Sequence, residues 1–220
     1  MVTRPPVGIM PFERIAIFVD GWNFKYATFD SFDMRVDFTK FLDYFRQNSI
    51  LLRSYYYTGE WDASAIEWYI RLTQPENPEA RKKELEDQAQ SERNFWRFLN
   101  RNGYKVVRKP VRIQRLRDGR ISPKADLDLE LAIDMLTLAD KCEKQILVSG
   151  DGDFIPLVEA IQSRGVRVVV VSTQHPEAWS KAHFRASDEL LDAADEVILV
   201  EHLRKFIERE DRPSGRGYGS

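Results

Sequence analysis

The chain has 220 residues, of which 43% are hydrophobic and 31% are charged, and its formal net charge is -2. This balance is ordinary for a folded, water-soluble chain, and the length suits one domain. Because the net charge is close to zero, overall composition gives no reason to expect a polyanion partner, and only local clusters of basic residues could indicate one. The single cysteine, Cys142, excludes a disulfide framework and a cysteine-based zinc site.

The ends of the chain differ in composition from its middle. No apolar run reaches membrane-spanning length and the first residues lack a signal-peptide core, so we expect a cytoplasmic protein without a membrane partner. We expect an N-terminal extension over residues 1–13 and one domain over 14–210. Residues 211–220 are rich in glycine and serine and are predicted to be a disordered tail.

Strands and helices are predicted to alternate along the chain. Strands are expected at 15–19, 50–57, 104–107, 146–148, 166–171 and, at an edge, 196–200. Three of them are continuous aliphatic runs, which are typical of parallel strands covered on both faces. Helical patterns occupy 38–47, 63–72, 78–100, 127–141, 155–163 and 201–210. The alternation predicts an α/β fold with a doubly wound, mostly parallel central sheet flanked by helices.

A densely charged helical insert lies near residues 76–100, after the Pro75 to Pro78 break. Its composition favours a solvated helix that projects from the sheet.

Acidic residues stand where two of the predicted strands end. Asp20 closes the first strand, and Asp151 and Asp153 follow the strand at 146–148 in the sequence SGDGDF. Ligands of open parallel sheets bind beyond the carboxyl ends of the strands, so these three side chains converge if the two strands are neighbours. Further acids lie on the helix predicted at 127–141 and just before it: Asp126, Glu130 and Asp134 are spaced four residues apart, and Asp128 lies on a different side of the first turn.

Such a cluster needs a counter-charge. Two carboxylates ~4 Å apart repel each other by roughly 4 kcal/mol at a surface-like dielectric, so several together hold protons or a divalent cation. Mg²⁺ and Mn²⁺ prefer oxygen ligands and support phosphodiester hydrolysis. Capping of the following helix is an equally good explanation for Asp153. For at least two of Asp126, Glu130 and Asp134, ordinary helix-end and surface charge is the better explanation.

Four blocks of the sequence carry a resemblance to a known family: IAIFVDGWNF, KADLDLELAIDML, ILVSGDGDFIPLVEAIQSRGVRVVVVS and ELLDAADEVILVE. Together they resemble the NYN domain family, and more closely the LabA-like branch of the PIN-like nuclease superfamily, over residues 14–201. The resemblance implies a Rossmann-like PIN-type fold and a ribonuclease that uses Mg²⁺ or Mn²⁺ and leaves a 3′-hydroxyl and a 5′-phosphate.

The same resemblance assigns roles to individual residues. The catalytic and metal-binding positions correspond to Asp20, Asp128, Asp151 and Asp153, with Asp134 as a further candidate. Asn23 and Ser149 match positions that contact phosphate or orient the ligands, and Lys124 is placed to neutralise the scissile group. The chain departs from the family in having Ala125 where glycine often follows that lysine.

RNA is the expected partner, and a basic segment suggests its path. Residues 104–124 contain eight lysines and arginines and one acid, Asp118. A turn at 117–120 predicts a hairpin, on which Arg112 and Arg115 could follow a phosphate backbone. The alternative is a hairpin whose charges only protect a sheet edge. Trp22 is the aromatic candidate for stacking on a base.

Two other functions compete with the nuclease. A haloacid-dehalogenase-like phosphatase also has a strand-end aspartate, but it needs a second acid two residues later, where this chain has Trp22. A regulatory module that binds RNA or protein without cutting also fits these residues, and a homodimer is compatible with the sequence.

Overall fold

The structure is a computed structural model and describes residues 12–174 and 186–210. Its centre is a parallel sheet of six strands in the order β3-β2-β1-β6-β7-β8. In chain order the strands are β1 (Glu13–Asp20), β2 (Ser49–Glu60), β3 (Tyr104–Pro110), β6 (Lys144–Val148), β7 (Arg167–Ser172) and β8 (Glu196–Leu199). The predicted α/β fold is confirmed, including the edge position of the last strand.

The strand order reverses between β1 and β6. From β1 the chain builds outward through β2 to β3, and it then returns beside β1 to build β6, β7 and β8 in the other direction. Val19 pairs with Val148, so both strands end at the same level. This junction is a topological switch point, where open α/β sheets bind their ligands.

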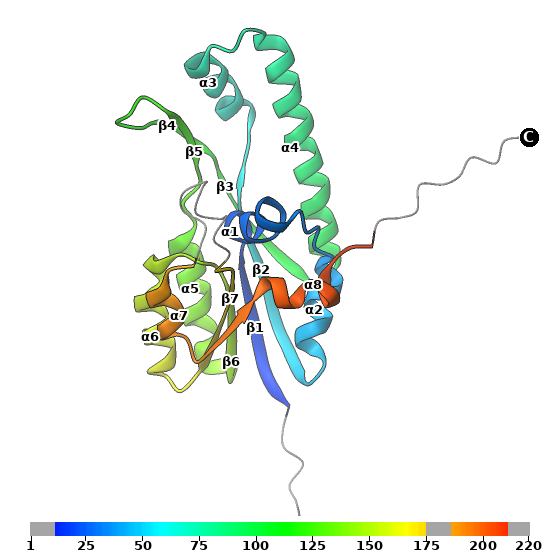
Figure 1. Cartoon of the computed structure of the whole chain (residues 1–220), viewed down its shortest axis with the longest axis vertical. Coiled ribbons are helices and arrows are strands. Elements are labelled where there is room, and N and C mark those ends of the chain that lie inside the picture. Colours follow the sequence, from blue (N-terminus) through cyan, green and yellow to red (C-terminus); the bar gives the residue numbers. More distant parts are fainter. Residues whose placement is uncertain (1–11, 175–185, 211–220) are drawn as a thin grey trace, which may run out of the picture.

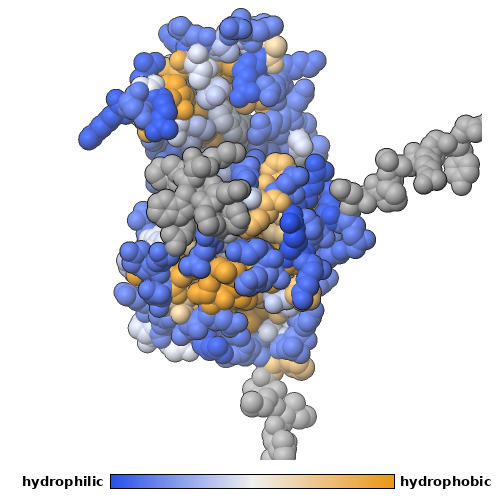
Figure 2. Space-filling model, viewed as in Figure 1, coloured by the Kyte–Doolittle hydropathy of each residue, from blue (hydrophilic) through white to orange (hydrophobic). Residues whose placement is uncertain are grey.

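Helices cover both faces of the sheet (Figure 1). Side chains alternate along β1, so that Phe18 packs towards one face while Ile17 and Val19 pack towards the other. The first face is covered by α5 (Asp128–Leu138), α6 (Ile155–Gln162) and α7 (Asp188–Ala193). The second is covered by α1 (Gly21–Lys25), α2 (Phe38–Arg46) and α8 (Val200–Ile207). The face seen in Figure 2 is mostly hydrophilic, with smaller apolar patches. Across the described ranges, no helix has the length and apolar character to cross a bilayer.

A second group of elements extends beyond the carboxyl ends of the strands (Figure 1). It consists of α3 (Ala63–Thr73), α4 (Pro78–Arg101) and the antiparallel hairpin of β4 (Arg112–Arg115) and β5 (Ile121–Lys124). The expectation of a merely solvated charged helix was incomplete. Leu85, Ala89, Trp96 and Leu99 form a buried stripe along α4, at the spacing of one helix face. The helix therefore forms a wall and does not stand free.

Three short helical segments were not predicted. They are α1, the π-helix η1 (Tyr26–Asp30) that continues it, and α7. The first two follow Asp20 directly, so they determine what surrounds the end of β1. The 3-10 turns η2 (Ala139–Lys141) and η3 (Gly152–Phe154) lie after α5 and before α6.

Gly59 lies near the end of β2, where sheet, hairpin and α1 meet. A Cβ atom on Gly59 would lie 2.6 Å from Trp22 Cζ2, 2.8 Å from Ala125 Cβ and 2.9 Å from Val111 Cγ2. Real Cβ atoms essentially never come so close to other atoms. The absence of a side chain therefore allows three segments to pack at one point.

We predict that Gly59→Ala lowers the free energy of unfolding by about 1–3 kcal/mol, because the added methyl overpacks this junction. Urea denaturation followed by circular dichroism measures the change. In the double variant Gly59→Ala/Trp22→Ala, the closest of these contacts is removed. The double variant should therefore lose less stability than the sum of the two single losses. If the two losses of stability simply add, the methyl group at position 59 does not clash with the Trp22 indole.

Candidate functional site

Asp20 is the last residue of β1 and the N-cap of α1. Its Oδ1 accepts a hydrogen bond from the backbone N–H of Asn23 at 3.2 Å. Its Oδ2 accepts bonds from Asn23 Nδ2 at 2.9 Å and from the Ser149 hydroxyl at 3.4 Å. Burial nevertheless raises the pKa of Asp20, with the nearby charge of Asp151 adding to the effect. The carboxylate is thus held in place while its ionisation is disfavoured.

The loop after β6 is tied to the same residues. Asn23 Oδ1 accepts the backbone N–H of Gly150 at 3.3 Å, and the Ser149 hydroxyl accepts that of Asp151 at 3.2 Å. Asn23 and Ser149 therefore bridge the ends of β1 and β6 and fix Asp20 relative to Asp151. The helix-capping alternative for Asp153 was wrong. Asp151 caps η3 by accepting the backbone N–H of Asp153 at 2.9 Å, and α6 begins without a side-chain cap bond.

Asp128 enters the site from the first turn of α5. Its pKa is raised to about 6, first by burial and then by the negative charges of Asp126, Asp151 and Asp20. Lys109 positions this turn, since its ammonium donates to the carbonyl of Asp126 at 2.8 Å and pairs with Glu130 at 2.7 Å. Acids from three separate parts of the chain therefore act on one another electrostatically.

These acids line one cavity of about 490 Å³, which we call the acidic cavity. Five of its lining residues are aspartates: Asp20, Asp126, Asp128, Asp151 and Asp153. Asn23, Trp22 and Lys124 complete the set of predicted residues on its walls. Lys124 pairs with Asp126 at 3.5 Å, so one cation already offsets part of the charge. Ser149 is buried behind the cavity and acts through its hydrogen bonds.

Three predicted residues lie elsewhere. Asp134, on α5, accepts a hydrogen bond from the Tyr57 hydroxyl at 2.9 Å and is not among the lining residues of the acidic cavity. Arg112 and Arg115 are exposed on β4, outside that lining as well. Of the histidines, His202 is exposed, and His175 and His183 lie outside the described residues. The tail at 211–220 and most of the extension at 1–13 also lie outside them.

Sequence reasoning missed several lining residues. Tyr57, Thr58 and Gly59 of β2 line the acidic cavity, and Asp126 does so despite its ordinary appearance at a helix end. These β2 residues reach the site because Tyr57 pairs with Asp20 and the strand continues to Glu60. The strand order that makes β2 a neighbour of β1 is not visible in the sequence.

The chemistry of these side chains suits a hard divalent cation, because carboxylate oxygens are the ligands that such ions prefer. Burial and mutual repulsion raise the pKa of Asp20 and Asp128, so a cation would relieve an unfavourable charge. Over residues 12–174 and 186–210, however, no three His, Cys, Asp or Glu side chains are already grouped as a metal site. The described side chains thus supply suitable ligands without holding them at ligating distances from one another.

Comparisons with known proteins agree with this geometry. The model of the NYN domain family matches residues 14–201. Low amplitude and bright protein LabA of Synechococcus elongatus is 30% identical over 207 residues, which cover 91% of this chain and 90% of that protein. A crystal structure of a protein of unknown function from Vibrio parahaemolyticus is 28% identical. It matches with a TM-score of 0.61 over 89% of this chain and 96% of that one.

The family match spans the whole sheet from β1 to β8 and includes every aspartate that lines the acidic cavity. The similarity to LabA extends over nearly the full length of both chains. The chain therefore belongs to the NYN domain family and is LabA-like within it.

Proposed function

We propose that this protein is a Mg²⁺- or Mn²⁺-dependent ribonuclease that hydrolyses phosphodiester bonds of single-stranded or structured RNA in the acidic cavity. The observation that carries the proposal is the gathering of five aspartates around one cavity at the switch point of the sheet. Membership of the NYN family supports a nuclease over a phosphatase. Trp22, at the position where a phosphatase of the haloacid-dehalogenase type needs an acid, packs beside Gly59.

Asp20, Asp128 and Asp151 would hold the metal, with Asp153 as a fourth ligand or an outer partner. When bound, the ion supplies activation of a water and stabilisation of the leaving oxygen. Three further residues assist the aspartates. Asn23 and Ser149 orient Asp20 through their hydrogen bonds. Lys124 lines the cavity beside Asp126 and can offset charge on the scissile phosphate.

A second candidate is an RNA-binding module that does not cleave. The absence of a preformed three-ligand group within the described ranges favours it. Incubation of the protein with mixed RNAs and Mn²⁺ separates the two candidates: products that appear with Mn²⁺ and not with EDTA support the nuclease. RNA that is bound and stays intact supports the module.

Asp128→Asn provides the sharpest test of the acidic cavity. We predict that kcat/KM for RNA cleavage falls by about 100-fold or more, because a charged ligand is lost. Without metal, the variant should be more stable than the wild type by about 1 kcal/mol at pH 7. Folding raises the pKa of Asp128 from its ordinary value of 3.8 to about 6. Ionised Asp128 therefore lowers the stability of the folded state at pH 7, asparagine carries no such charge, and solvent screening of this half-buried group keeps the difference small.

The matched control is Asp140→Asn, the same change at an exposed residue of η2 that pairs only distantly with Arg164, at 3.7 Å. Cleavage and thermal unfolding of the control should follow the wild type. Added Mn²⁺ should raise the Tm of the wild type more than that of Asp128→Asn. If Asp128→Asn cuts RNA at the wild-type rate, Asp128 has no part in catalysis.

The hairpin path is tested by charge reversal. We predict that Arg112→Glu/Arg115→Glu raises KM for a long RNA about 10-fold and flattens its dependence on salt, because two phosphate contacts are lost. Lys141→Glu/Arg164→Glu makes the same change of net charge away from the cavity and should leave both quantities unchanged. Equal effects of the two pairs would indicate that only the overall charge matters.

A further inference from the structure

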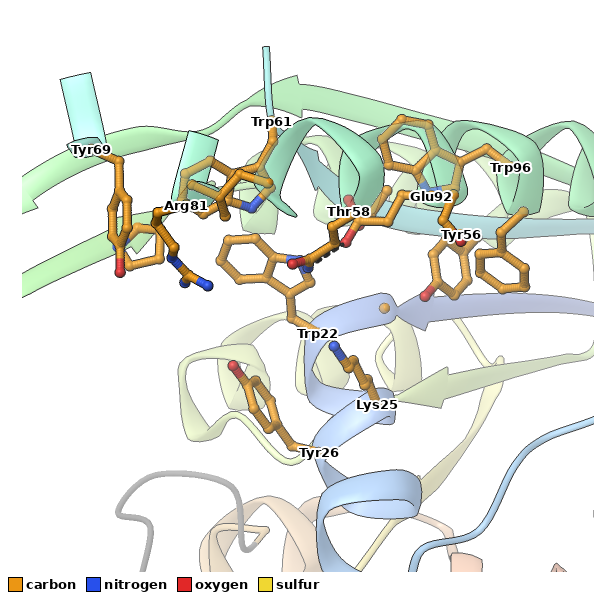
Figure 3. Close-up of a pocket in the computed structure, with 16 residues that line it drawn as sticks. Trp22, Lys25, Tyr26, Tyr56, Thr58, Trp61, Tyr69, Arg81, Glu92 and Trp96 are labelled. Atoms are coloured by element: carbon orange, nitrogen blue, oxygen red, sulfur yellow. Dashed lines mark hydrogen bonds between the residues drawn. The ribbon is translucent and has the colours of Figure 1, made fainter. Parts of the chain in front are cut away.

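A second cavity of about 530 Å³ adjoins the acidic cavity, and we call it the aromatic cavity (Figure 3). Residues of α1, β2, α3, α4 and β5 line it. Trp22, Tyr26, Thr58 and Pro123 line both cavities. The two cavities are therefore neighbours that share part of their walls.

The walls of the aromatic cavity are rich in flat rings. Trp22 projects from α1 on one side, and Trp61 projects from the connection between β2 and α3 on the other (Figure 3). Trp61 is held by an edge-on contact with Tyr69, with ring centroids 5.5 Å apart and planes at 88°. Tyr56, Phe95 and Trp96 form the inner end. Both Trp22 and Trp61 are only partly buried, so each residue keeps some exposed surface, and indole rings are suited to stacking on a base.

Polar groups stand at defined places among these rings. Glu92 comes from α4, is partly buried, and accepts a hydrogen bond from Gln88 Nε2 at 3.2 Å. Burial raises the pKa of Glu92. Lys25 and Arg81 also line the cavity (Figure 3). A ligand for this site needs a flat apolar body, hydrogen-bond donors on one edge and a negative charge.

We propose that the aromatic cavity binds one unpaired guanine base of the RNA, next to the nucleotide whose phosphate lies in the acidic cavity. This assignment rests on the proposed function, because it presumes an RNA substrate. The base stacks on Trp22 and Trp61, and Lys25 and Arg81 attract the adjoining phosphates.

Guanine is the base that matches Glu92. Its Watson–Crick edge places two donors, N1–H and N2–H, side by side, and a carboxylate offers two acceptor oxygens in a matching arrangement. The corresponding edges of adenine, cytosine and uracil each set an acceptor beside the donor, and this acceptor would face a carboxylate oxygen. Glu92 therefore discriminates between bases while the rings provide affinity for any of them.

The proposal is tested by the binding of three fluorescein-labelled oligouridine RNAs. The first contains a single guanosine, the second has inosine in its place, and the third has an abasic unit there. All proteins are full chains that carry Asp128→Asn, so that cleavage does not interfere. We expect the abasic unit to weaken binding about 10-fold or more, and inosine, which lacks the 2-amino group, about 5-fold.

Two variants locate the effect. Glu92→Gln should bind the guanosine and inosine RNAs equally, and Trp61→Ala should bind the guanosine and abasic RNAs almost equally. The controls are Glu86→Gln, on the exposed side of α4, and Trp68→Ala, a residue of α3 that is 46% exposed. Both should keep the wild-type preferences. Circular dichroism establishes folding, and Glu92→Gln tests the site even if Trp61→Ala does not fold.

Cleavage by the wild type in Mn²⁺ is measured in parallel. If RNA is cut but the three RNAs bind equally to all variants, the aromatic cavity does not hold a base, while the proposed function stands. If the abasic unit weakens binding but inosine does not, the role of Glu92 is overturned. If no RNA binds to any protein and the wild type cuts none, both the proposed function and this inference fail; if the wild type cuts RNA but no RNA binds, only this inference fails.

Discussion

The parallel pairing of β1 with β6 is the constraint on which the acidic cavity depends. Val19 and Val148 are partners in this pairing, so Asp20 and Ser149 leave the sheet at the same level. Two hydrogen bonds then join the loops, from Ser149 to Asp20 and from Gly150 to Asn23. The strands are buried and continuous, and they hold like charges closer together than flexible loops would. The energy of core packing thus maintains an arrangement that electrostatics alone opposes.

The elements beyond the sheet add shape to this charge. The strands β2 and β3 run together past the end of β1, and α3, α4 and the hairpin enclose the space above α1 (Figure 1). The sides of these elements that face the aromatic cavity carry most of its rings, together with Arg81 and Glu92. Because Trp22, Thr58 and Pro123 belong to both cavities, the proposed metal chemistry and the proposed base recognition would take place side by side.

Much of the sheet and most of the acids could be predicted from the sequence, and the reasons are physical. Aliphatic runs such as 166–171 have few other places to be buried, and the aspartates that follow parallel strands stand where such sheets bind ligands. What failed depended on tertiary contacts. The helix α1 is five residues long and is stabilised by its Asp20 cap and the buried Phe24, which no periodicity reveals. Along α4, the buried stripe of Leu85, Ala89 and Trp96 was hidden among many charges.

Asp20 and Trp22 stand in the first turn of the same short helix, and this proximity links the two cavities energetically. The cap at Asp20, the packing of Trp22 beside Gly59 and the buried Phe24 all help to fix the orientation of this helix, which continues into η1. Under the proposed function, an ion at Asp20 that shifted this turn would also move the indole. Thermodynamic reciprocity would then give a base held by the indole the same factor of influence on the affinity at the carboxylate.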